Sequence, residues 1–506
     1  MRPDPSVADH PLGHLLISAA HKSSGKTTVT LGLVAALRAR GLWVQPFKKG
    51  PDYIDPMWLA AAAGRPCYNL DFNTQAPDEI VDLFASRSAG AEVSLVEGNK
   101  GLHDGTAQDG SNSNAALARL LGAPVVLVLD TRGMTRGIAP LVLGFQAFDP
   151  QVRLRGVILN QVGGARHESK LREALATHTD VTVLGAVARS ADLEIRERHL
   201  GLIPSNEHDL ARSVVERIAA RVGEQVDLDA LLALSREAAS LAPAPAAAPA
   251  ADAPRIRIGI ARDPAFGFYY ADDLESLERA GADLVPFNTL TDARLPEVDG
   301  LFIGGGFPET HLRALEANVA LREAIRAAID GGLPAYAECG GLMYLARGIR
   351  WGDEEGRMVG VLPVDVVMQD RPLGRGYVRL AETGLGPWPV AQDSAVRELP
   401  AHEFHYSRLE NVPEGLRYAY RIHRGHGIDG QRDGIVYRNL LASYVHLRSV
   451  RANPWAERFV AFVRRTRTQR TGPPSPSPTA PDTRRGVVGA GSGPVKKSIA
   501  ESQSWY

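Results

Sequence analysis

The sequence predicts an α/β protein of two domains, each a mostly parallel β-sheet with helices on both faces. Short apolar runs alternate with amphipathic stretches along most of the chain, as expected for parallel sheets; examples are residues 125–129, 156–159, 256–260 and 300–303. Residues 241–254 contain almost only alanine and proline, which suits an extended spacer and not a packed element. We therefore expect two sheets, one on either side of this linker.

The pattern divides the chain into five segments. Residues 1–12 are expected to form a flexible N-terminus, residues 13–240 the first domain, residues 241–254 the linker and residues 255–465 the second domain. Residues 466–506 are rich in proline, serine, threonine, glycine and arginine, so they have too few large apolar side chains to offset the entropy lost on ordering. We expect this tail to be disordered.

Composition excludes several classes of function. The chain has 506 residues, of which 44% are hydrophobic and 23% charged, which is ordinary for a globular protein with more than one core. A net charge of -1 gives no bulk attraction to nucleic acid or to an anionic membrane. Only two cysteines occur, the N-terminus lacks an apolar signal core, and no stretch is apolar enough to cross a bilayer. We expect a cytoplasmic protein with no nucleic-acid or membrane partner.

A phosphate-binding loop lies near the start of the first domain. An apolar run at residues 15–20 is followed by His-Lys-Ser-Ser-Gly-Lys-Thr-Thr at residues 21–28 and then by an amphipathic stretch, so a strand, a loop and a helix are predicted. Ala20 stands where the usual motif has its first glycine. The loop predicts an ATP site formed by Gly25, Lys26, Thr27 and Thr28, with the Thr27 hydroxyl on Mg²⁺.

Two further segments of the first domain place acidic residues at strand ends. Residues 48–56 follow a strand, so their lysines and carboxylates should lie at the carboxyl edge of the sheet, unless the segment is only a polar turn. Residues 93–105 run from a strand into a glycine-rich loop with Glu97 and Asp104 at its two ends. Carboxylates beside phosphates suit Mg²⁺, whereas the glycines could serve either a close ligand approach or turns alone.

The second domain carries a candidate nucleophile. Residues 333–337 form an apolar strand and lead through Glu-Cys-Gly-Gly into a helix, a sharp turn that exposes Cys339 at a helix start. A buried structural cysteine is the alternative. Backbone N–H groups of Gly306 and Gly340 could stabilise an oxyanion, although glycines after a strand can also serve a tight turn. His446, in an apolar strand far downstream, is the candidate general base, or else a structural histidine.

These motifs together resemble the cobyrinate and hydrogenobyrinate a,c-diamide synthases of vitamin B12 biosynthesis. The resemblance rests on Gly-Lys-Thr at residues 25–27, Gly-Pro-Asp-Tyr-Ile-Asp at residues 50–55 and Glu-Gly-Asn-Lys-Gly-Leu-His-Asp-Gly at residues 97–105. It covers residues 13–465. It implies a P-loop NTPase-like first domain similar to dethiobiotin synthetase and a cobalamin-type class I glutamine amidotransferase as the second domain.

The resemblance also implies roles for individual residues. Asp52 and Asp104 match acidic residues of the metal and phosphoryl-transfer site, and Glu97 matches a carboxylate beside the phosphates. Tyr53 and Ile54 match positions that line the corrinoid pocket. The catalytic residues expected are Cys339, His446, Asp52, Asp104 and Glu97, and the metal ligands expected are Thr27, Asp52, Glu97 and Asp104.

The sequence leaves three points open: the role of Asn160, the group that orients His446 and the role of residues 401–407. Asn160 stands where related ATP-binding proteins contact adenine, but a strand-end asparagine also caps turns. Class I amidotransferases generally carry an orienting glutamate two residues after the catalytic histidine, whereas this chain has Arg448 there. The group that orients His446 therefore cannot be named from sequence. Residues 401–407 resemble a segment usual in this branch, and we assign them no chemistry.

The expected function is ATP- and glutamine-dependent amidation of the a and c acetate carboxylates of hydrogenobyrinate or cobyrinate. ATP, L-glutamine and the corrinoid are the expected partners and Mg²⁺ the cofactor; the cobalt content of the corrinoid and a homodimer are left open. Cobyrate synthase and the synthase acting on nickel sirohydrochlorin are related alternatives. A P-loop ATPase switch with an inactive amidotransferase domain is an alternative from another class.

Overall fold

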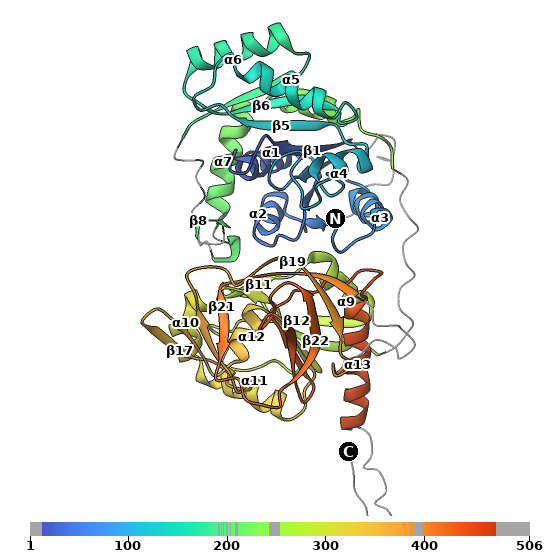
Figure 1. The fold of residues 1–506 in the computed structure, drawn as a ribbon, viewed down its shortest axis with the longest axis vertical. Helices are drawn as coiled ribbons and strands as arrows, with labels where there is room; N and C mark the ends of the chain where they lie inside the picture. Colours follow the sequence, from blue (N-terminus) through green and yellow to red (C-terminus); the bar gives the residue numbers. More distant parts are fainter. Residues whose placement is uncertain are drawn as a thin grey trace, which may run out of the picture.

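Two domains lie end to end in the computed structural model, the first above the second in Figure 1. The structure describes residues 13–190, 211–241, 254–388 and 398–471, together with residues 193, 195, 197–198, 201–202 and 204–207. The predicted flexible N-terminus, almost all of the predicted linker and the end of the predicted tail lie outside the described residues. Helix α13 (Trp455–Thr471) continues through residue 465, where the second domain was expected to end.

The first domain is a seven-stranded sheet in the order β3-β2-β4-β1-β5-β6-β7, and its neighbouring strands run parallel. Alternate residues of β1 enter opposite cores: Leu15 and Ile17 face one layer of helices and Leu16 faces the other. The strands are β1 (Gly13–Ala19), β2 (Val44–Lys49), β3 (Tyr68–Leu70), β4 (Val93–Glu97), β5 (Val125–Asp130), β6 (Leu154–Val162) and β7 (Thr182–Ala188).

Helices cover both faces of this sheet. One layer consists of α1 (Lys26–Ala39), α2 (Ile54–Ala63), α7 (Ala211–Gln225) and α8 (Leu228–Ser235). The other consists of α3 (Pro77–Ser88), α4 (Asn114–Leu121), α5 (Ile138–Phe148) and α6 (Ala165–His178). A short ribbon, β8 (Glu197–Arg198) with β9 (Gly201–Leu202), and the 3₁₀ turn η3 (Ser205–Glu207) precede α7.

The second domain is a nine-stranded sheet in the order β12-β10-β13-β15-β24-β23-β22-β19-β20. The strands from β12 to β24 run parallel, and those from β24 to β20 pair antiparallel. The predicted α/β class is confirmed, but the antiparallel extension was not predicted. The strands are β10 (Ile256–Ala261), β12 (Ala282–Phe287), β13 (Gly300–Ile303), β15 (Ala335–Glu338), β19 (Gly374–Glu382), β20 (Glu398–His405), β22 (Arg417–Arg424), β23 (Arg432–Tyr437) and β24 (Leu440–Ser443).

Helices α9 (Ala271–Arg279) and α13 pack on one face of this sheet, and α10 (Leu312–Ala317), α11 (Val319–Asp330) and α12 (Gly340–Leu345) on the other. A four-stranded sheet flanks the domain: β16 (Gly348–Trp351), β17 (Glu354–Arg357), β18 (Asp365–Met368) and β21 (Ser407–Glu410). A ribbon of β11 (Phe266–Phe268) and β14 (Gly305–Gly306) and the 3₁₀ turn η4 (Pro308–His311) complete it.

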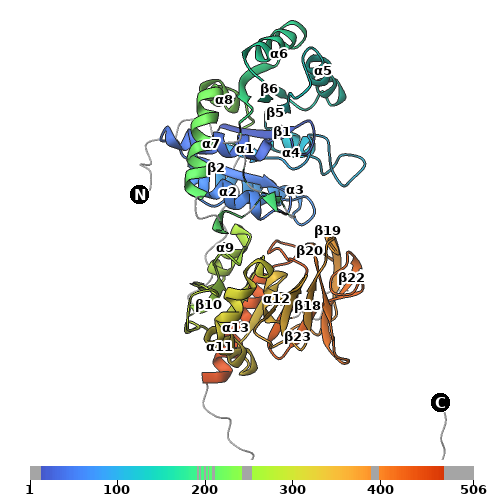
Figure 2. The same cartoon turned by 90° about the vertical axis from the view of Figure 1, so that its left-hand side faces the viewer.

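The domains face each other through α2 and α3 of the first and α9 and β19 of the second, in both views (Figures 1 and 2). Side chains bridge this boundary: Asn73 Nδ2 donates to the Ala401 carbonyl at 3.0 Å, and the Tyr377 hydroxyl donates to Asp71 at 3.2 Å. Within the described residues, no helix is long and apolar enough to cross a membrane.

Candidate active sites

The phosphate-binding loop connects β1 to α1, as its sequence predicted. Gly25 precedes α1 with φ at 85°, in the left-handed region that favours glycine. A Cβ atom there would lie 2.1 Å from Asn160 Nδ2, so the position also requires the absence of a side chain. Asn160 Nδ2 donates to the Ser24 carbonyl at 2.9 Å and so supports the loop from the end of β6. A contact between Asn160 and adenine stays a prediction.

Four side chains converge beside this loop. The Thr27 hydroxyl donates to Glu97 Oε1 at 2.7 Å and lies 3.3 Å from Asp55 Oδ2. Lys48 Nζ donates to the same two atoms, at 2.5 Å to Asp55 and 2.8 Å to Glu97. Asp55 and Lys48 received no individual role from the sequence, although both lie in the segment expected at this edge of the sheet. Lys48 joins the cluster because β2 pairs with β4 and sets Lys48 opposite Glu97, and Asp55 joins it from the first turn of α2.

Burial sets the electrostatics of this cluster. Glu97 is fully buried, and burial raises its pKa although the charge of Lys48 opposes that rise. Burial alone would lower the pKa of Lys48, but the charges of Asp55 and Glu97 raise it well above its usual value. Burial and the neighbouring charge of Lys48 lower the pKa of Lys26, the lysine of the phosphate-binding loop. The cluster therefore holds closely packed charges of both signs.

The donor chemistry of this cluster fits Mg²⁺. Glu97 Oε2 is buried and has no hydrogen-bond partner among the described residues, so one carboxylate oxygen is left for a ligand. Across the described part of the chain, no group of three or more His, Cys, Asp or Glu side chains forms a complete metal cage. Mg²⁺ sites usually combine one or two carboxylates with phosphate oxygens and water.

The two other predicted acids lie at the margin of the cluster. Asp52 Oδ1 accepts the backbone N–H groups of Ile54 and Asp55 and so holds the start of α2, while its Oδ2 is 3.9 Å from Lys48 Nζ. Asp104 is exposed, and its Oδ2 accepts the Gly101 N–H at 2.9 Å. The structure thus brings Asp52 to the edge of the cluster and leaves Asp104 outside its hydrogen bonds.

The second candidate site is built on a strained turn. Cys339 lies between β15 and α12 with φ at 49° and ψ at -105°, a conformation that non-glycine residues rarely adopt and that is typical of a nucleophile elbow. A Cβ at Gly340 would lie 2.9 Å from the backbone nitrogen of Gly306, so only glycine lets the two predicted oxyanion donors approach each other. The side chain of Cys339 lies in a pocket shared with His446.

His446 is held between the thiol and a carboxylate. Its ring lines the same pocket as the Cys339 thiol, and its Nδ1 lies 3.3 Å from Glu338 Oε2. Burial alone would lower the pKa of this imidazole, but the hydrogen bonds and charges of Cys339 and Glu338 raise it to about 10. The raised pKa keeps this imidazole a strong base beside the thiol, as a general base for a cysteine nucleophile requires.

Two neighbours of His446 were missed in the sequence. Glu338 precedes the cysteine, and its register opposite Ser443 in the β15–β24 pair brings it to the histidine. His402, in the segment without assigned chemistry, stacks on His446 with ring centroids 4.9 Å apart, and the two residues exchange backbone hydrogen bonds. The only sequence signal for Glu338 was its place beside the nucleophile.

A pocket of about 360 Å³ at the domain boundary is lined by residues 51–54 and Lys100 from the first domain and by Cys339 and His446 from the second. It reaches the first candidate site only at its margin, through Asp52. The ring of Tyr53 lies 5.2 Å from that of His446. Tyr53 also stacks on Phe268 at 5.4 Å. The residues expected to line the corrinoid pocket, Tyr53 and Ile54, therefore also form a wall of the cysteine site.

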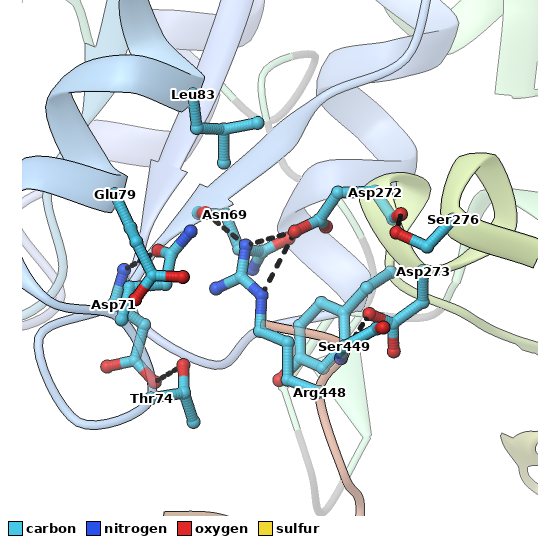
Figure 3. Close-up of polar contacts among 12 residues, drawn as sticks. Asn69, Asp71, Thr74, Glu79, Leu83, Asp272, Asp273, Ser276, Arg448 and Ser449 are labelled. Atoms are coloured by element: carbon cyan, nitrogen blue, oxygen red, sulfur yellow. Dashed lines mark hydrogen bonds and ion pairs between the residues drawn. The ribbon is translucent and has the colours of Figure 1, made fainter. Parts of the chain in front are cut away.

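Arg448, two residues after the histidine, crosses the domain boundary (Figure 3). Its guanidinium is buried and pairs with Asp272 at 2.8 Å, while the same nitrogen donates to the Asn69 carbonyl at 2.5 Å. The side chain of Asn69 donates in turn to the carbonyls of Gly50 and Asp52. Arg448 thus connects the histidine segment to the loop that carries Asp52 and Tyr53.

Comparisons with known proteins agree with this arrangement. Residues 257–454 match the CobB/CobQ-like glutamine amidotransferase domain, and residues 13–196 match an AAA domain. A protein of Magnetococcus marinus named cobyrinate a,c-diamide synthase is 46% identical over 89% of this chain and 97% of its own length. Proteins of the same name from Methanosarcina acetivorans and Archaeoglobus fulgidus are 40% and 39% identical, over 86% and 88% of this chain and 92% and 96% of their own lengths.

Proposed function

The chain belongs to the cobyrinate a,c-diamide synthase family, and we propose that it converts the a and c acetate carboxylates of cobyrinate, or of its cobalt-free counterpart hydrogenobyrinate, to amides with ATP and glutamine. The observation that carries the proposal is the shared pocket in which Cys339 and His446 face the loop of Asp52 and Tyr53. Ammonia released at the cysteine therefore arises beside the synthetase domain. Both cysteines are free, which suits the reducing cytoplasm as the site of the reaction.

At the glutaminase site, the thiolate of Cys339 attacks the side-chain amide of glutamine. The imidazolium of His446 supplies the proton that leaves with ammonia, and a glutamyl thioester remains. Backbone N–H groups of Gly306 and Gly340 stabilise the oxyanion of the tetrahedral intermediate. Water then hydrolyses the thioester to glutamate and restores the thiol.

At the synthetase site, an oxygen of the substrate carboxylate attacks the γ-phosphate of ATP, and ADP leaves. The product is an acyl phosphate, whose phosphate is a far better leaving group than oxide. Ammonia attacks the acyl carbon, and inorganic phosphate is released with the amide. Lys26 binds the outer phosphates and offsets their charge during transfer.

Mg²⁺ at this site would be held by the Thr27 hydroxyl with the carboxylates of Glu97 and Asp55, and it would supply neutralisation of phosphate charge. We assign Asp52 and Asp104 to the same phosphoryl-transfer site, Asp52 through the loop that also carries Tyr53. Tyr53 and Ile54 contact the corrinoid from that loop, and Asn160 contributes to nucleotide binding from below the phosphate-binding loop.

Cys339→Ala tests the division of labour between the two sites. The variant should lose glutamine-driven amidation because the nucleophile is gone, and it should retain amidation driven by ammonium chloride because the synthetase site is intact. Product mass and ADP release report the reaction in both cases. Loss of both reactions in a folded variant would contradict the proposal.

A further inference from the structure

We infer that Glu338 is the positioning carboxylate of the glutaminase, replacing the glutamate that other class I amidotransferases carry two residues after the histidine. The inference rests on the proposed function, in which Cys339 and His446 hydrolyse glutamine. Glu338 is 3% exposed, and its Oε2 lies 3.3 Å from His446 Nδ1. The carboxylate ends β15, directly before the nucleophile, and does not come from the segment of the base, which follows the end of β24.

The usual position of this carboxylate serves another purpose in this chain. Arg448 is 1% exposed, and its guanidinium pairs with Asp272 and contacts the first domain (Figure 3). The guanidinium carbon Cζ of Arg448 also lies over the ring of Tyr270, 4.9 Å from the ring centroid. The residue two positions after His446 is thus committed to the domain boundary, and Glu338 occupies the place facing the imidazole.

Both oxygens of Glu338 are engaged, which fixes the carboxylate. Oε1 accepts the Leu447 N–H at 3.0 Å and the Tyr336 hydroxyl at 2.5 Å, leaving Oε2 directed at His446. Tyr336 is fully buried among the aromatic rings of Phe302 and Trp455. The carboxylate is therefore held from two sides by rigid neighbours, as a positioning group requires.

The chemical consequence concerns the proton on the imidazole. An acceptor at Nδ1 keeps the proton on that nitrogen, so Nε2 is free to take the thiol proton, and the carboxylate then stabilises the imidazolium. The other titratable groups facing this ring are Cys339, Tyr53 and His402. Burial, then the charge of His446, lowers the pKa of His402 well below its usual value, so this neighbour contributes no positive charge.

Glu338→Gln tests the assignment with almost no change in volume. The Leu447 N–H and the Tyr336 hydroxyl both donate to one oxygen, so the amide oxygen should take that place and the amide NH₂ should face Nδ1. An N–H donor facing Nδ1 favours the imidazole tautomer that carries its proton on Nε2. In that tautomer Nε2 cannot accept the proton of the Cys339 thiol. We expect kcat for glutamine hydrolysis to fall about 10- to 100-fold with KM for glutamine little changed.

Two further measurements separate positioning from structure. Because the imidazolium loses its anion, the basic limb of the pH profile of kcat/KM for glutamine should move to lower pH in Glu338→Gln. Ammonia-driven amidation should stay at the wild-type rate. Tyr336→Phe, which keeps the carboxylate but removes one of the donors that orient it, should give a smaller loss of kcat in the same direction.

Asp433→Asn is the matched control. Asp433 is a fully buried acid that accepts the N–H groups of Tyr444 and Val445, so it holds the same segment without contacting the imidazole. This variant should lower the melting temperature and keep the wild-type pH profile. An equal shift of the profile in Asp433→Asn would reduce Glu338 to a structural residue and overturn the inference.

The outcomes distinguish this inference from the proposed function. Wild-type protein that releases no glutamate from glutamine refutes the proposed function itself. Wild-type protein that hydrolyses glutamine, with Glu338→Gln equal to it in kcat and pH profile, refutes only the inference. If Glu338→Gln does not fold, Tyr336→Phe decides: a wild-type kcat and pH profile there contradicts the role of Glu338.

Discussion

Replacing Arg448 by methionine should open the contact between the histidine segment and the first domain. The substitution keeps most of the apolar stem and removes the guanidinium that pairs with Asp272 and donates to the Asn69 carbonyl. Asp272 is 7% exposed, so it would be left as a buried carboxylate without its charged partner. Removing one partner of a buried pair costs about 3 to 5 kcal/mol.

That cost should appear in local hydrogen exchange. A loss of 3 kcal/mol corresponds to about a 100-fold rise in the opening equilibrium. The reporting amides are those of Ser449, which donates to Asp273, and Arg451, which donates across the boundary to Glu79. Exchange of peptides covering these amides, measured by mass spectrometry, should accelerate by about that factor, whereas the β5 strand should exchange as in the wild type.

A double-mutant cycle checks the reasoning. Asp272→Asn relieves the unpaired charge, so the double variant should be less destabilised than the sum of the single variants, by about 2 to 3 kcal/mol. The loosened boundary should also shift the ratio of glutamate to ADP away from the wild-type value in assays with the corrinoid. Additive single effects together with unchanged exchange would refute the assigned contact.

Three further predictions follow from the two sites. Glu97→Gln removes the carboxylate that accepts the hydrogen bond of the Thr27 hydroxyl. ATP-dependent amidation should fall by about 100-fold, while glutamine hydrolysis persists. An equal loss of both activities would contradict separate sites. Gly305→Ala places a Cβ 2.8 Å from His446 Cε1, so the imidazole must move. The kcat of glutamine hydrolysis should fall by about 10-fold or more, while ammonia-driven amidation stays unchanged. A wild-type kcat would show that the ring accommodates the methyl group. The pKa of His446 is raised to about 10, so the charged imidazolium contributes its full stabilisation of the fold below the unfolded-state pKa, and this stabilisation is lost as pH rises through about 10. The melting temperatures of wild type and His446→Gln, measured between pH 6 and pH 10.5, should therefore converge at the alkaline end. A difference in melting temperature that stays constant over this range would contradict the prediction.

Local patterns predicted the fold class and the two strand-to-helix turns on which candidate site residues lie. The phosphate-binding loop and the turn at Cys339 have short signatures because each is one strand, one loop and one helix. Glu338 and Asp55 had no such signature: Glu338 reaches His446 through the pairing of β15 with β24, and Asp55 reaches Thr27 from the start of α2. The contact between Tyr53 and His446 depends on the domain boundary and lies beyond what spacing along the chain can reveal.

The antiparallel half of the second sheet was missed for a related reason. Strands β19, β20, β22 and β23 are partly exposed, and glycines interrupt β19 and β23, so their apolar pattern is weaker than that of the buried parallel strands. Segment 401–407 runs from β20 into the start of β21, and it places His402 beside His446. The contact of His402 with His446 became visible only through the backbone pairing of the two residues.

The most direct test of the central claim is the acceptor dependence of the wild-type reaction. Purified protein is given ATP, Mg²⁺ and glutamine with cobyrinate, with hydrogenobyrinate or with no acceptor, and ADP, glutamate and product mass are recorded. The account predicts acceptor-dependent release of ADP and glutamate and a product in which OH has been exchanged for NH₂ at two carboxyl groups. ATP turnover that is the same with every acceptor, without a change in corrinoid mass, would contradict it and favour an ATPase switch.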